Sequence, residues 1–140
     1  MIVGHTLNRV KWGIHSIDEY TKLIEPLVSL KERYPNLKIL GPNCIDFEPH
    51  YPIAALKNLP KGLRFNALSH LLYVDRRGAP ENKQGCFGIV EKAALLNAVA
   101  SHSGSCESKL VISEVNWPLA NTREWSPVDA TYSPPDSAAS

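Results

Sequence analysis

A single carboxylate follows an apolar run in the stretch KLVISEVNWPL at residues 109–119. Strands usually end in turn residues, whereas this one ends in Glu114, with Asn116 and Trp117 directly behind it. A carboxylate in such a place can attack as a nucleophile, and an amide and an aromatic ring can bind a polar ligand that has a flat face. The residue types and their spacing therefore fit a ligand site with Glu114 as its reactive group. They fit equally a carboxylate that caps the strand by accepting backbone donors or by pairing with an arginine such as Arg9.

Four short apolar runs, at residues 1–4, 37–40, 67–74 and 109–115, alternate with helical patterns. The runs lack polar alternation, which is typical of parallel strands covered on both faces. Helices are predicted at about 16–34, 51–58 and 89–102. In the first, Ser16 and Glu19 form a capping box and Pro26 bends the helix. The order predicts an α/β fold, a parallel βαβαβαβ unit with its chemistry at the carboxyl ends of the strands.

With Glu114 at such a strand end, the segment VISEVNWP resembles the strand-seven nucleophile segment of clan A retaining glycoside hydrolases. Their common form is I-T-E, followed within a few residues by Trp or Pro. Those enzymes are (β/α)8 barrels, so the resemblance implies a partial TIM barrel over residues 1–119 that contains strands four to seven. It also implies hydrolysis of O-glycosidic bonds in an oligosaccharide or polysaccharide, with Glu114 as the nucleophile. The substrate-binding residues that we expect are His5, Asn8, Trp12, His70, Tyr73, Asn116 and Trp117.

The first run departs from this family. Clan members end strand four with a segment like I-G-N-E-P-N, whose Glu is the acid/base, whereas this chain has V-G-H-T-L-N with Thr6 at that position. Retaining hydrolysis uses two carboxyl groups about 5–5.5 Å apart, and a threonine hydroxyl cannot protonate the leaving oxygen near neutral pH. The substitutes that the sequence offers for the acid are His5, Asp46, Glu48, Asp75 and Glu81.

Two other readings stay open. The missing acid/base carboxylate favours a non-catalytic carbohydrate-binding relic of such an enzyme. The second is an unrelated small α/β domain, in which Glu114 has a structural role at the end of a strand.

The chain has 140 residues, whereas a closed eight-stranded barrel usually takes about 250. Four strands cannot close a barrel, so both outer strands would present unpaired backbone groups. Three arrangements would resolve this: the chain is part of a longer protein, two copies associate through the open edges, or the strands form a small open sheet. We favour the first. Residues 120–140 are rich in Pro, Ser and Ala and are expected to be irregular or disordered.

The composition limits the partners. A net charge of +1 without a basic stripe argues against nucleic acid, and no apolar run reaches the roughly 20 residues that a membrane helix needs. We see no signal peptide, so a cytoplasmic location is expected. The three cysteines and five histidines show no metal-binding spacing. We therefore expect no metal and no cofactor.

Overall fold

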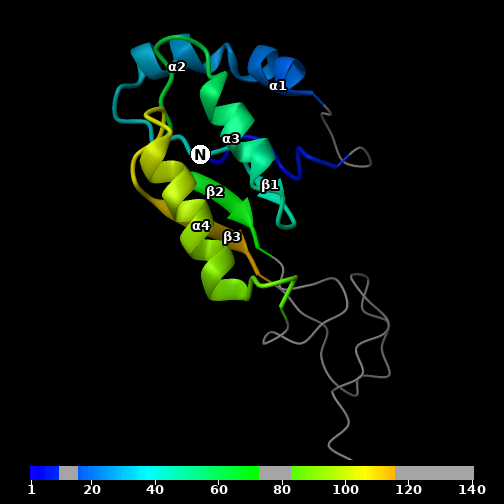
Figure 1. Ribbon diagram of the computed structural model, residues 1–140. Coiled ribbons are helices and arrows are strands. Elements are labelled where there is room, and N and C mark those ends of the chain that lie inside the picture. The colour runs from blue at the N-terminus through cyan, green and yellow to red at the C-terminus, as the bar shows by residue number, and fades with distance from the viewer. Residues whose placement is uncertain (10–15, 73–82, 116–140) are drawn as a thin grey trace, which may run out of the picture.

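The computed structural model describes residues 1–9, 16–72 and 83–115 (Figure 1). Its three strands form a parallel sheet in the order β1-β2-β3. In chain order the elements are α1 (Ile17–Ile24), α2 (Leu27–Arg33), β1 (Cys44–Ile45), α3 (His50–Lys57), β2 (Leu68–Leu71), α4 (Ile89–His102) and β3 (Leu110–Glu114). The α/β class with a parallel sheet, predicted from the alternating runs, is therefore confirmed.

The N-terminal segment extends this sheet without forming a regular strand. Ile2 and Leu40 form an isolated parallel bridge, and Leu40 forms another with Ala67. The amide of Val3 donates to the carbonyl of Leu40 at 2.9 Å, and the amide of Gly41 donates to the carbonyl of Ala67 at 3.2 Å. Four chain segments thus run side by side in the order in which they occur in the sequence.

Two of the predicted strands are wrong in their bounds. The run at 37–40 forms only isolated bridges at Leu40, and the strand proper comes later, at Cys44–Ile45. Pro42 lies between these two pieces and has no amide hydrogen to donate to a sheet ladder, so the regular pairing is interrupted there. The run at 1–4 likewise contributes one bridge, at Ile2.

The helices follow the sequence signals closely. The Ser16 hydroxyl accepts from the Glu19 amide at 3.1 Å, and the Glu19 carboxylate accepts from the Ser16 amide at 3.0 Å, which is the predicted capping box. The predicted bend at Pro26 is a full break, because α1 ends at Ile24 and α2 begins at Leu27. The helix predicted at 89–102 has those bounds in the structure.

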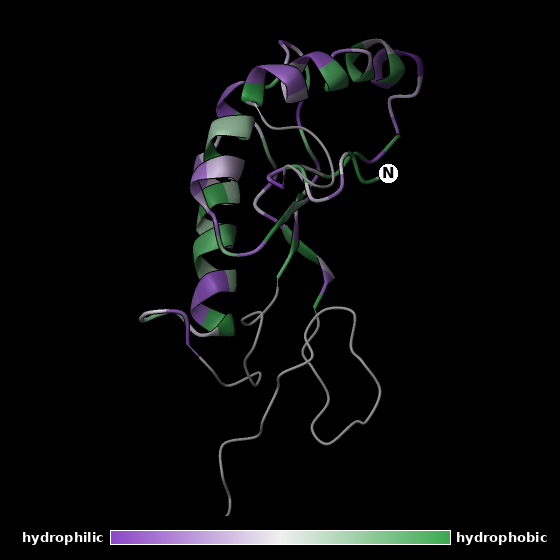
Figure 2. Ribbon diagram, turned by 90° about the vertical axis from the view of Figure 1, so that its right-hand side faces the viewer, coloured by the Kyte–Doolittle hydropathy of each residue, from purple (hydrophilic) through white to green (hydrophobic). Residues whose placement is uncertain are grey.

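The core lies between the helices and one face of the sheet. In Figures 1 and 2, α4 runs along β2 and β3 on one side. Phe65 and Leu68 are fully buried beneath the helices, together with Leu96 from α4. All four residues of β2 are buried, as expected for a strand covered on both faces, whereas β3 is exposed from Val111 onward. Coverage on both faces is therefore confirmed for β2 and wrong for β3.

Candidate functional site

A hollow of about 290 Å³ lies at the carboxyl end of the sheet. This volume is near the lower end of the ~300–1,000 Å³ that small-molecule sites usually have. Four segments that are far apart in the sequence meet around it. Its lining residues are Ile2, Gly4, His5, Asn43, Leu71, Ser113 and Glu114. Of the residues predicted from the sequence, the hollow thus brings together Glu114 and His5.

Glu114 reaches the hollow through an irregularity in the pairing of β2 with β3. His70 is paired with Ile112, but the next residue, Leu71, is paired with Glu114, so Ser113 is an extra residue on β3. The Leu72 amide donates to the Glu114 carbonyl at 2.9 Å and fixes the backbone there. A bulge of this kind redirects the side chains that follow it. The Glu114 side chain is exposed at the rim of the hollow.

A small polar cluster lies behind Glu114. Asn43 is 4% exposed, and its side-chain oxygen accepts from the Ser69 hydroxyl at 2.7 Å and from the Ser113 hydroxyl at 2.8 Å. These bonds join β2 and β3 to the loop before β1. The sequence prediction did not include the three residues among its site residues. A signal existed for Asn43, which follows the second apolar run, but the two serines look like ordinary strand residues.

His5 stands on an unusual piece of backbone. Gly4 before it has φ +90°, and Thr6 after it has φ +52°. Positive φ is uncommon for any residue other than glycine and is a clear outlier for a β-branched one. The Thr6 hydroxyl donates to the His5 carbonyl at 2.8 Å, and Thr6 is only 4% exposed. This turn buries Thr6 and leaves His5 exposed at the hollow.

Asn8 has a positioning role in the structure. Its side-chain amide donates to the Ile45 carbonyl at 2.7 Å, and its side-chain oxygen accepts from the Ile45 amide at 2.9 Å. The side chain thus pairs with the end of β1 as a neighbouring strand would. It also donates to the Glu48 carboxylate at 2.9 Å. Asn8 is not among the residues that line the hollow, so it connects the N-terminal segment to β1.

Arg9 holds two of the carboxylates that the sequence offered as acids. Its guanidinium contacts the Asp46 carboxylate and lies 2.9 Å from a Glu48 oxygen. Burial acts to lower the pKa of Arg9, but the hydrogen bonds and charges of Asp46 and Glu48 raise it overall. Both carboxylates therefore have oxygens occupied by a fixed cation, and neither lines the hollow.

His70 is fully buried, at 0% exposed, and does not line the hollow. Its Nδ1 donates to the Leu71 carbonyl at 2.8 Å, and its Nε2 has no hydrogen-bond partner among the described residues. Burial lowers the pKa of His70, although the Leu71 carbonyl and the charges of Asp46 and Glu48 act to raise it. Among the described residues, His70 therefore has no exposed surface with which it could make the predicted contact to a substrate.

This lowered pKa predicts a pH-dependent stability. His70 has an ordinary pKa of 6.5 in the unfolded chain and a lower pKa in the folded protein. As the pH falls toward and below 6.5, the unfolded state therefore binds more protons than the folded state. We expect the free energy of unfolding to decrease from about pH 7 to about pH 5, by at most about 1.4 kcal/mol per pH unit from this group. Urea unfolding across that range should show a flatter profile for His70→Gln than for the exposed control His102→Gln. If the unfolding free energies of the two variants changed equally with pH, the lowered pKa of His70 would be contradicted.

The other predicted residues lie outside the described ranges. They are the substrate-binding candidates Trp12, Tyr73, Asn116 and Trp117, the acid candidates Asp75 and Glu81, and the tail at 120–140.

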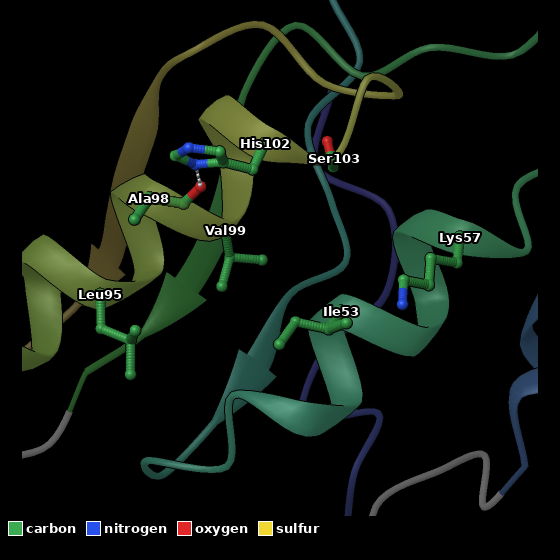
Figure 3. Close-up of a pocket in the computed structure, with 7 residues that line it drawn as sticks. All are labelled: Ile53, Lys57, Leu95, Ala98, Val99, His102 and Ser103. Carbon is green, nitrogen blue, oxygen red and sulfur yellow. Dashed lines mark hydrogen bonds between the residues drawn. The ribbon is translucent and has the colours of Figure 1, made fainter.

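A second hollow of about 340 Å³ lies between α3 and α4 (Figure 3). Ile53 from α3 faces Leu95 and Val99 from α4, and Lys57 and His102 stand toward the other end. Its lining is mostly apolar and contains no carboxylate among the described residues. Since it lies between helices and away from the strand ends, we place the candidate site at the Glu114 hollow.

Comparison of the chain with protein-family models, with curated proteins and with solved structures finds no significant match. Among the helices of the described segments, none has the length and apolar character needed to cross a bilayer. The described residues also contain no group of three or more His, Cys, Asp or Glu side chains able to hold a metal ion.

Proposed function

We propose that this chain is a partial (β/α)8 barrel of the glycoside hydrolase kind and that the Glu114 hollow binds a sugar unit of an oligosaccharide or polysaccharide. In this proposal the Glu114 carboxylate attacks the anomeric carbon, and the O-glycosidic bond is hydrolysed with retention of configuration. The observation that carries the proposal is the position of Glu114, which ends a parallel strand and lines a hollow together with His5 and Asn43.

The arrangement of the sheet also supports the proposal. Four parallel segments lie in sequence order, and α4 packs on one face of β2 and β3. On β3, Val111 and Ile112 are each 36% exposed. β3 is an edge strand of the sheet. In a closed barrel a further strand would pair with β3, and the side chains on the face of the sheet away from the helices would fill the barrel interior.

A second function, binding of a glycan without cleavage, is favoured by a different observation. Glu114 is the one carboxylate among the described lining residues of the hollow, whereas retaining hydrolysis uses two. Asp46 and Glu48 are the carboxylate alternatives from the sequence that the structure describes, and both are held by Arg9. A site without an acid would still bind a sugar through its amide, hydroxyl and carboxylate groups.

Titration of the protein against a panel of oligosaccharides separates the two functions. Binding followed by release of a reducing sugar with the configuration of the substrate is the result expected from hydrolysis. Saturable binding with no product would favour the non-catalytic function. Neither binding nor product across the panel would overturn both and would favour a structural role for Glu114. The two events are measured independently, by calorimetry and by NMR detection of the product anomer.

A further inference from the structure

We propose that His5 is the proton donor of the Glu114 hollow and takes the role that a second carboxylate has in retaining glycosidases. This inference rests on the hydrolysis proposed above and adds the identity of the acid. Its physical basis is that His5 and Glu114 are the two ionisable side chains among the described residues that line the hollow.

Of the acid candidates that the structure describes, Asp46 and Glu48 contact Arg9, whereas His5 lines the hollow. Asp46 contacts the Arg9 guanidinium, and Glu48 accepts from both Arg9 and Asn8 at 2.9 Å. A general acid must present a free proton to the leaving oxygen of a bound substrate. These two carboxylates instead serve as acceptors in a network that fixes the loop after β1. His5 differs from them because its side chain is exposed at the hollow itself.

The backbone around His5 points to a functional reason for that exposure. Residues in sparsely populated backbone regions cost folding free energy and cluster at functional sites. Thr6 is such a residue, with φ +52° and a β-branched side chain, and Gly4 on the other side has φ +90°. The Thr6 hydroxyl donates to the His5 carbonyl and the Arg9 amide donates to the Thr6 carbonyl, so the turn is held from both sides. The result of this strained turn is that His5 faces the hollow.

The reaction that follows can be written in full. A Glu114 oxygen forms a bond to the anomeric carbon while the bond from that carbon to the glycosidic oxygen breaks, and its electron pair goes to the oxygen. The protonated His5 imidazole gives its proton to that oxygen, which leaves as an alcohol, and His5 becomes neutral. A water molecule then attacks the same carbon, His5 takes a proton from it, and the Glu114 carboxylate is released. Histidine suits both steps because an imidazole can donate a proton and then accept one.

The test compares two leaving groups on the same sugar. A dinitrophenyl glycoside needs no proton because its phenolate is stable, whereas a methyl glycoside needs one. With panels of both types of glycoside, His5→Gln should lower kcat/KM for the methyl series by about 10²–10⁴-fold. For the dinitrophenyl series, His5→Gln should change the rate of the first step, in which the glycosidic bond breaks, by less than about tenfold. The exposed control His102→Gln should leave both series unchanged.

The outcomes separate this inference from the function on which it rests. Suppose that Glu114→Gln abolishes turnover, but that His5→Gln lowers kcat/KM equally for the methyl and dinitrophenyl series or leaves both unchanged. The hydrolase proposal then stands and the His5 assignment is overturned. The assignment is also overturned if Asp75→Asn or Glu81→Gln produces the leaving-group-selective loss and His5→Gln does not. If the unaltered chain cleaves no dinitrophenyl glycoside, the hydrolase proposal falls and the His5 role falls with it.

Discussion

Replacing Glu114 by Gln is expected to lower kcat for a cleaved glycoside by on the order of 10⁴-fold or more, the range found when a nucleophile is removed. Glutamine has the shape of glutamate, but its amide oxygen carries no charge and cannot form the glycosyl ester. Because the side chain is exposed at the end of β3, the free energy of unfolding should change by less than about 0.5 kcal/mol. The measurement is kcat and KM on the dinitrophenyl series, together with calorimetric binding of the same sugars.

Glu32→Gln is the matched control, since Glu32 is an exposed carboxylate on α2 and does not line the hollow. It removes the same charge and should leave kcat unchanged. Turnover that survives in Glu114→Gln would refute the nucleophile assignment. Retained sugar binding with lost turnover is the combination that the proposed mechanism requires.

Gly4→Ala is expected to destabilise the fold by about 2–4 kcal/mol, the largest stability effect that we predict. Gly4 has φ +90°, which a residue with a Cβ rarely adopts. A Cβ there would lie 2.7 Å from Cγ of Leu7 and would also overlap its Cδ1. Leu7 is 3% exposed and belongs to the core, so it has little room to move. Either the core or the turn that carries His5 must shift, and both stability and sugar binding should therefore fall.

Gly104→Ala isolates one part of this effect. Gly104 also has positive φ, at +69°, but a Cβ there would meet nothing within 4 Å. It should cost only the backbone strain, about 1–2 kcal/mol, and leave sugar binding unchanged. Urea unfolding of both variants measures the difference. Equal losses would show that Leu7 moves aside freely and would contradict the crowding that we describe at Gly4.

Local signals predicted the helices well. The capping box at Ser16 and the interruption at Pro26, which was predicted as a bend and is a full break, act within one turn of the chain. Their outcome therefore depends on few distant contacts. The first two strands were predicted less well. Hydrophobicity marked 37–40, but the regular ladder lies at Cys44–Ile45 because strand pairing depends on partners from elsewhere in the sequence. For the same reason the sequence could not show that β3 would be exposed.

The candidate site divides in a similar way. Glu114 was found because it follows an apolar run, and His5 because it follows another. His70 was also found by its place in a run, but the structure buries it and it does not line the hollow. Ser69 and Ser113 had no signal, because their role depends on a shared bond to Asn43 across the sheet.

The sequence by itself determined the α/β alternation, the positions of the helices and the presence of a carboxylate at the end of the last strand. These follow from the periodicity of apolar residues and from capping chemistry, which act over a few residues. Only the tertiary structure decided which polar groups meet. The register of β2 against β3 brought Glu114 to the hollow, and the long-range bonds of Asn8 and Arg9 engaged Asp46 and Glu48 outside it. Such pairings join residues about 40 positions apart, and their energy depends on geometry that no local pattern encodes.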